Sequence, residues 1–145
     1  MPNRQVKEVI QGASFATVEL SATVREVAVL MKKHHSSAIL VVDKKHRLVG
    51  ICTERDVVFD VVAEGHDPDQ ALVAKIMTEE PQTISPDKPF GHALHLMYEG
   101  GFRHVPVVDG IGRPLGVLSA RDALVGDARQ FEHELIQREE ITVIL

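Results

Sequence analysis

The stretches GICTERD (Gly50–Asp56) and GVLSARD (Gly116–Asp122) share one seven-residue pattern, and their first residues lie 66 positions apart. Each has a glycine, then two positions that hold apolar residues or cysteine, then a hydroxyl residue, a variable position and Arg-Asp. When the chain is aligned with itself at this offset, residues 17–58 match residues 83–124 at ten of 42 positions without a gap. Ordinary residue usage gives about two or three matches by chance. The chain therefore contains two copies of one structural unit.

Each copy carries a helical pattern followed by two apolar runs. Apolar residues recur at i, i+3, i+4 and i+7, which predicts one buried helix face in each copy. These residues are Val24, Val27, Ala28 and Met31 in the first copy, and Phe90, Ala93, Leu94 and Met97 in the second. We expect the second of these helices to end at Gly100-Gly101, with a left-handed cap. The runs AILVVD and HVPVVD and the runs LVGIC and LGVL predict a hairpin in each copy, with Pro106 at a strand edge or an irregular point.

The two repeated stretches fall where the second hairpin strand passes into a helix. Thr53 and Ser119 are candidate N-caps, each with an aspartate, Asp56 or Asp122, three residues later. The helix after Thr53 is predicted to end near Gly65 and to bury four valines, Val57, Val58, Val61 and Val62. HDPDQ (residues 66–70) predicts a further helix, with Asp67 as its cap, Pro68 at its first position and Gln70 completing a capping box. VKEVI (residues 6–10) is the counterpart of the segment LVAKIM before the second copy.

These elements predict an α/β fold in which two β-α-β-β-α repeats pack sheet to sheet with pseudo-two-fold symmetry. One copy of about 60 residues is marginally stable alone, and packing two together buries both sheets. We place the first repeat at residues 5–66 and the second at 67–126, with a C-terminal extension at 127–145. Apolar spacing from Leu124 through Ala128, Phe131 and Leu135 predicts that the last helix reaches about Gln137. We expect the apolar tail ITVIL (residues 141–145) to pair within the chain or across a dimer.

Composition argues against several classes of function. The formal net charge of −5 and the 4% aromatic content disfavour nucleic acid and anionic lipid as partners. The N-terminus has no signal-like apolar region and no stretch is long enough to span a bilayer. With a single cysteine, Cys52, these features lead us to expect a cytoplasmic protein. His34-His35 and the pair His92 and His95 make poor metal sites, and no catalytic constellation is apparent, so we expect neither a bound metal nor an enzyme.

The repeated pattern Gly-x-x-Thr/Ser-x-x-Asp resembles that of the tandem cystathionine-β-synthase (CBS) domain pair, or Bateman module. VAKIMTEEPQTISPD is similar to the start of a family member, FRHVPVVD to its central strand, and GVLSARD to its closing motif. The resemblance covers residues 5 to 126 and implies a stand-alone CBS-pair protein. Family members bind adenosine-containing ligands and tend to associate, so it also implies a ligand-sensing regulatory module, a homodimer and a regulated protein partner. The expected ligand is AMP first, then ATP or ADP, NAD or S-adenosylmethionine, with no required cofactor.

The resemblance also implies roles for individual residues. Asp56 and Asp122 would accept hydrogen bonds from ribose hydroxyls, and Thr53 and Ser119 would contact phosphate or ribose. Basic groups would hold phosphate, and strand residues would hold adenine. The basic residues are Arg55, Arg121, Arg103 and His104; the strand residues are Val18, Ile39, Ile84, Val105 and Pro106.

The two motifs are not equivalent, and a ligand-free function is the alternative to ligand binding. The first copy has Ser37 and Ala38 where the second has Arg103 and His104, so we expect the second motif to bind phosphate better. The alternative is that both motifs only cap helices, each contributing about 0.5–2 kcal/mol to stability. The chain would then be a ligand-free scaffold for dimerisation and protein interaction.

Overall fold

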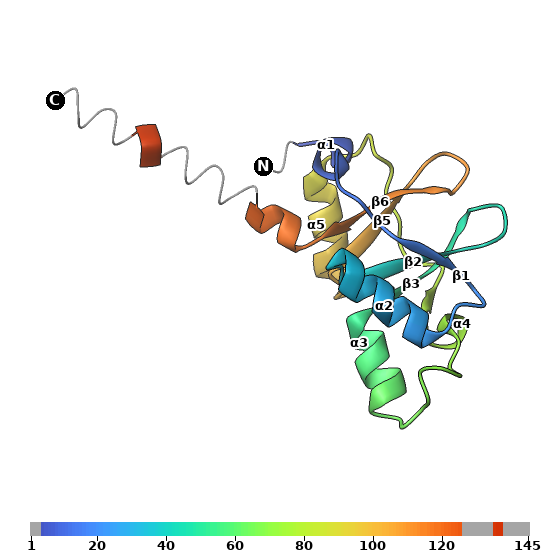
Figure 1. The fold of residues 1–145 in the computed structure, drawn as a ribbon. Coiled ribbons are helices and arrows are strands. Elements are labelled where there is room, and N and C mark those ends of the chain that lie inside the picture. Colours follow the sequence, from blue (N-terminus) through green and yellow to red (C-terminus); the bar gives the residue numbers. More distant parts are fainter. Residues whose placement is uncertain (1–3, 126–134, 138–145) are drawn as a thin grey trace.

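Two copies of one unit make up the described part of the chain, residues 4–125 and 135–137 of a computed structural model (Figure 1). The first copy contains α1 (Val6–Ile10), β1 (Thr17–Glu19), α2 (Val24–His34), β2 (Ala38–Val42), β3 (Leu48–Thr53), α3 (Glu54–Val57) and a π-helical turn, η1 (Val58–Val62). The second contains α4 (Val73–Ile76), β4 (Thr78–Glu79), α5 (Phe90–Gly100), β5 (His104–Val108) and β6 (Pro114–Ser119), followed by helical residues 121–125. The predicted helix through Ala128 and Phe131 and the ITVIL tail lie outside the described residues.

The two long helices end alike although their sequences differ. α2 begins with a capping box, in which the Glu26 backbone N–H donates to the Thr23 hydroxyl at 3.2 Å. It ends at His35, in the left-handed region with φ 49°, and α5 ends at Gly101 with φ 70°. The predicted glycine cap of α5 is therefore confirmed. The first copy adopts the same geometry without a glycine, in a conformation that non-glycine residues seldom adopt.

The predicted hairpins are present, and Pro106 explains why the strand beside β5 is shorter than its counterpart β1 in the first copy. The first sheet has the order β1-β2-β3-β4, whereas the second contains β5 and β6 and only an isolated parallel bridge between Ile84 and Val107. In the first copy the Leu40 N–H donates to the Ala16 carbonyl at 3.2 Å. The equivalent residue of the second copy is Pro106, which has no N–H to donate. The strand beside β5 is therefore reduced to the Ile84 bridge.

The short helices α1 and α4 are exchanged between the copies. α1 belongs to the first copy in sequence but packs on the second, and α4 belongs to the second but packs on the first. Val6 of α1 is fully buried in a cluster with Phe90 and Leu118 of the second copy, and its N–H donates to the Lys88 carbonyl at 2.9 Å. Val73 of α4 is fully buried in the cluster of the first copy. The first copy thus completes its core with α4, and the second with α1. The two copies interlock, so we expect them to unfold together.

A third apolar cluster lies between the copies. Alternation along β2 directs Ala38 and Leu40 away from the helices, and these side chains are buried with Ile51. Val117 of the second copy packs against them. The copies also meet at the hairpin ends, where the Leu48 N–H donates to the Gly112 carbonyl at 2.9 Å. The predicted packing of one sheet on the other is confirmed.

The segment HDPDQ forms a turn rather than the predicted helix. The Asp67 side chain accepts the Asp69 N–H at 2.9 Å, which starts the turn as expected of a cap. Carbonyls in and directly after this segment accept hydrogen bonds from the start of α2. The Arg25 N–H donates to the Pro68 carbonyl and the Val24 N–H to the Ala71 carbonyl. Tertiary hydrogen bonds therefore replace those that would have continued a helix.

The helix after Thr53 is also less buried than predicted. Val61 is 1% exposed and Val57 is half-buried, but Val58 and Val62 are 50% and 68% exposed. Residues four apart share a helix face, and only the stripe that holds Val57 and Val61 meets the core. The prediction that all four valines are buried was wrong, because α3 packs against α2 and β3 on one side alone.

Candidate functional site

The aspartate of each repeated motif caps the helix that it begins. The Asp56 Oδ2 accepts the Thr53 N–H at 2.8 Å and the Thr53 hydroxyl at 3.2 Å. The Asp122 Oδ2 accepts the Ser119 N–H at 2.8 Å. Both carboxylates are half-buried, and the hydrogen bonds within the described residues use only one oxygen of each. Capping therefore fixes each carboxylate and leaves a second charged acceptor for another group.

A hydrogen bond joins the two copies beside these motifs. His104 begins β5 opposite Ser119, and its Nε2 lies 2.8 Å from the Ser37 Oγ of the first copy. The backbone ties each motif to the same place, since the Glu54 N–H donates to the Ser37 carbonyl and the Ala120 N–H to the Arg103 carbonyl, both at 3.0 Å. The predicted site residues Ser119, Asp122 and His104 are thus gathered at the boundary between the copies.

The charge on His104 depends on groups from both copies. Burial lowers the pKa of His104 below its ordinary value, and this outweighs the nearby Glu54 and Asp122 carboxylates, which raise it. The Arg103 guanidinium lowers the pKa further. His104 is therefore mainly neutral at pH 7. Glu54 is not among the predicted site residues; the difference from its counterpart, Ala120, was the signal in the sequence.

His104 makes a specific contribution to the pH dependence of stability. The unfolded chain takes up a proton at His104 near its ordinary pKa of 6.5, whereas the folded chain does so only at lower pH. Protonation of His104 therefore favours the unfolded chain. The free energy of unfolding is unaffected by the titration of His104 above pH 6.5 and decreases as the pH falls below it. We expect urea midpoints at pH 7.5, 6.5 and 5.5 to fall less steeply for His104→Gln than for the native chain. Parallel curves for the two proteins would contradict this prediction.

The predicted phosphate-binding arginines are on the surface. Arg103 and Arg121 are exposed, and so is Arg55, whose guanidinium lies 5.1 Å from the centre of the Phe59 ring. Phe59 follows Arg55 by four residues, so this cation–π contact lies along the helix. Arg103 is the arginine whose charge reaches His104. The structure therefore associates one arginine with the junction directly.

The predicted adenine-binding residues do not share one environment. Ile39 and Val105 are fully buried and Ile84 is 4% exposed, all three in the clusters beneath the helices. Val18 is half-buried, and Pro106 is buried in β5. Because strand residues alternate between faces, the residues on the boundary between the copies are the alternate set, which includes Leu40, Ile51 and Val117. These three residues are not among the predicted site residues, because both faces of β2 are apolar and the sequence does not distinguish them.

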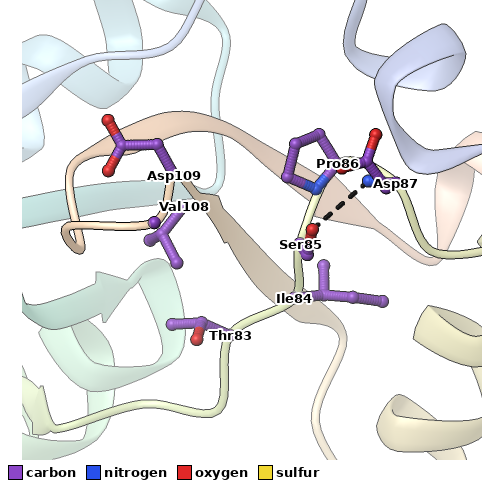
Figure 2. A pocket seen from close by; sticks show the side chains of 8 residues that line it. Thr83, Ile84, Ser85, Pro86, Asp87, Val108 and Asp109 are labelled. Atoms are coloured by element: carbon purple, nitrogen blue, oxygen red, sulfur yellow. Dashed lines mark hydrogen bonds between the residues drawn. The ribbon is translucent and has the colours of Figure 1, made fainter.

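A separate pocket of about 520 Å³ lies at the far end of β5 from His104 (Figure 2). Residues 83–87 form one wall and residues 108–110 the other. Of the predicted site residues it contains only Ile84, and its polar groups include the Asp87 N–H, which donates to the Ser85 hydroxyl at 3.4 Å. This pocket is therefore distinct from the two motif junctions.

Other chemistry finds no support in the described part of the chain. Within it no three His, Cys, Asp or Glu residues come together as a metal site. Burial raises the pKa of Cys52 to about 12, with Asp56 and Asp60 adding to the rise, so its thiol is unreactive near neutral pH. Among the described residues, no helix has both the length and the apolar character required to cross a membrane.

The CBS domain family model matches residues 6–62 and 73–126, so the chain belongs to the CBS domain family, with two domains in tandem. An uncharacterised protein of Methanopyrus kandleri is 34% identical over 102 residues, which are 70% of this chain and 52% of that protein. An uncharacterised 17.7 kDa protein of Acidianus ambivalens is 37% identical over 105 residues, 72% of this chain and 62% of its own length. The chain thus spans little more than half the length of these relatives.

Solved structures share the fold. A CBS domain protein of Pyrobaculum aerophilum in complex with AMP is 29% identical, with a TM-score of 0.76, and the match covers 82% of this chain and 89% of that one. The CBS domain pair of protein MJ0100, in complex with 5-methylthioadenosine and S-adenosyl-L-methionine, is 26% identical with a TM-score of 0.76 and coverages of 92% and 99%. A hexameric CBS-CP12 protein of bloom-forming cyanobacteria is 30% identical, with a TM-score of 0.76 and coverages of 83% and 69%.

Proposed function

We propose that this chain is a regulatory module that binds an adenosine-containing ligand between its two copies. One observation carries the proposal: at both motif junctions a half-buried carboxylate is fixed through one oxygen and has its other oxygen available. A fixed charged acceptor suits the hydroxyls of a ribose. The AMP and S-adenosylmethionine complexes of the similar proteins support the same ligand class.

The second motif is the preferred site for a ligand that carries phosphate. Asp122 accepts from the ribose, and Ser119, at a helix start where the backbone dipoles favour negative charge, contacts phosphate. Arg103, Arg121 and His104 supply positive or hydrogen-bonding groups. At the first motif Thr53, Arg55 and Asp56 repeat part of this set, with Arg55 turned along its helix onto Phe59. AMP is the first ligand to test, followed by ATP, ADP, NAD and S-adenosylmethionine.

The module acts by population shift rather than by catalysis. A ligand that touches both copies favours one arrangement of them, and a regulated protein partner in the cytoplasm responds to that surface. AMP has about 23 non-hydrogen atoms, and at about 0.3 kcal/mol each they give a dissociation constant near 10 μM. Such an affinity suits a sensor of metabolite concentration.

A thermal-shift screen tests this function against the alternative. The alternative, a ligand-free scaffold, is favoured by the fact that both aspartates already cap helices. A ligand at 100 times its dissociation constant stabilises the folded state by about 2.7 kcal/mol. We therefore expect AMP at 1 mM to raise the melting temperature measurably. If AMP, ADP, ATP, NAD and S-adenosylmethionine all leave it unchanged, the scaffold is the better account.

We also propose that the chain forms a homodimer through the helices that follow the motifs. Val58 and Phe59 are 50% and 54% exposed, and their counterparts in the repeat, Leu124 and Val125, are 68% and 51% exposed. Each copy thus exposes two consecutive large apolar side chains at equivalent positions, and neighbouring exposed apolar groups are typical of association surfaces. A second copy of this chain would cover them with the same kind of side chain.

Phe59→Glu is expected to weaken this dimer strongly. A buried aromatic anchor contributes about 2 kcal/mol or more to an interface, so the dimer dissociation constant rises at least about thirtyfold. Size-exclusion chromatography with light scattering measures the mass of each protein. Tyr98→Glu is the matched control, because Tyr98 is also exposed, at 87%, but lies on α5. A native chain that is monomeric, or a Phe59→Glu variant as dimeric as the native chain, would refute this interface.

A further inference from the structure

His104 occupies a place that has no counterpart on the other side of the pseudo-two-fold axis. Its equivalent in the first copy is Ala38, and the equivalent of its neighbour Glu54 is Ala120. Only one side of the boundary therefore carries an imidazole facing a carboxylate. Ser37 holds that imidazole from the opposite copy, at 2.8 Å between Oγ and Nε2.

The charges around His104 come from every element that meets it. Glu54 belongs to α3 of the first copy, Asp122 follows β6, and Arg103 directly precedes β5, which begins at His104. The two carboxylates favour the protonated ring, whereas burial and the Arg103 charge favour the neutral ring. The second effect is larger, so the pKa of His104 lies below its ordinary value. One further negative charge near the ring would shift this balance toward the protonated form.

We propose that His104, positioned by Ser37, makes ligand binding at the second motif proton-linked, so that a phosphate-bearing adenosyl ligand binds together with a proton and adenosine binds without one. This inference rests on the proposed function. It concerns regulation of the same site: the module would respond to pH and nucleotide together. It would also distinguish nucleotides from nucleosides by charge.

The direction of the effect follows from linkage. A phosphate monoester brings a charge of about −1.5 to −2 at pH 7, which stabilises the imidazolium form of His104. Affinity for AMP then rises as the pH falls toward the range in which His104 is protonated even without ligand. A single linked proton changes the affinity by at most about tenfold per pH unit. Adenosine brings no charge, so its affinity stays level.

Ser37 is a positioning residue in this scheme. A serine hydroxyl both donates and accepts, so it can bond Nε2 whether or not that nitrogen carries a proton. The contact therefore holds the ring in place through the titration instead of breaking. Ser37→Ala is expected to reduce the pH dependence of AMP binding, and Ser37→Thr, which keeps the hydroxyl, is expected to restore it.

Calorimetric titrations of AMP and of adenosine at pH 6.5, 7.0, 7.5 and 8.0 test the proposal. Measuring each in two buffers of different ionisation enthalpy gives the number of protons taken up. AMP itself titrates near pH 6, so the quantity compared is the difference between the native chain and His104→Gln. We expect the native affinity for AMP to strengthen between pH 8.0 and 6.5 by about threefold to tenfold more than that of the variant. His66→Gln, at an exposed histidine in the turn after η1, should match the native chain.

The outcomes separate this inference from the function on which it rests. If neither AMP nor adenosine binds, this inference is overturned, and the proposed function fails as well if ATP, ADP, NAD and S-adenosylmethionine also do not bind. If AMP binds and the native and His104→Gln proteins take up the same number of protons, only the inference is overturned. Nuclear magnetic resonance of the His104 ring carbons in the native chain gives a reading that needs no variant. There AMP should raise the pKa of His104 and adenosine should leave it in place; an unmoved pKa with AMP bound would also overturn the inference.

Discussion

Asp122→Ala raises the dissociation constant for AMP by about tenfold to 100-fold, in the outcome that we expect from calorimetric titration. A hydrogen bond to a charged acceptor is worth about 1.5–3 kcal/mol, and each 1.4 kcal/mol is a factor of ten. The variant also loses the cap that Asp122 gives to the Ser119 N–H, at a cost of about 0.5–2 kcal/mol in stability. Circular dichroism should show that it remains folded.

Asp56→Ala is the matched variant for this experiment. It removes the same cap from the first copy, where the Asp56 Oδ2 accepts from both the N–H and the hydroxyl of Thr53. Its cost in stability should therefore equal or exceed that of Asp122→Ala. Its effect on AMP affinity should be smaller, since Arg103 and His104 stand at the second motif. Equal AMP affinities for Asp122→Ala and the native chain would remove Asp122 from the site.

Phe90→Ala is expected to cost about 3–5 kcal/mol of the free energy of unfolding, measured by urea titration. Phe90 is fully buried at the start of α5, in the cluster that Val6 of α1 completes. A loss of this size is a large part of the stability of a small protein, about 5–15 kcal/mol in total. Because the two copies interlock through α1 and α4, the variant should unfold in a single transition at a lower midpoint.

Tyr98→Ala provides the control on the same helix. Tyr98 is 87% exposed, so its removal should change the free energy of unfolding by no more than about 0.5 kcal/mol. Two separate transitions in the Phe90→Ala protein, one per copy, would contradict the exchange of α1 and α4 between the copies.

The repeat made most of the fold predictable from the sequence. Both hairpins and the apolar faces of α2 and α5 follow from local spacing, which is the same in the two copies, and the cap of α5 follows from its glycine pair. Pro106 was correctly expected to disturb its strand, because a missing N–H has the same consequence in any sheet. The two aspartates were expected three residues after their caps, and their carboxylates do bond there.

The errors and omissions lie where contacts distant in sequence decide the structure. HDPDQ carries every local signal of a helix start, yet its Pro68 carbonyl and that of the following Ala71 accept hydrogen bonds from α2. Val58 and Val62 fit an apolar helix face, yet only one stripe of that helix meets the core. The bond between Ser37 and His104 joins residues 67 positions apart. Aligning the copies identifies equivalent residues, but it does not show which of them meet across the boundary.

Calorimetric titration of AMP into the native chain at pH 7 tests the central claim most directly. A ligand site between the copies predicts saturable binding with a dissociation constant on the order of 10 μM. The same titration of Asp122→Ala should show the weaker binding described above. If the native chain shows no saturable heat up to millimolar AMP and no gain in melting temperature, AMP is not its ligand, and the same result with ATP, ADP and NAD contradicts the claim that it senses an adenine nucleotide.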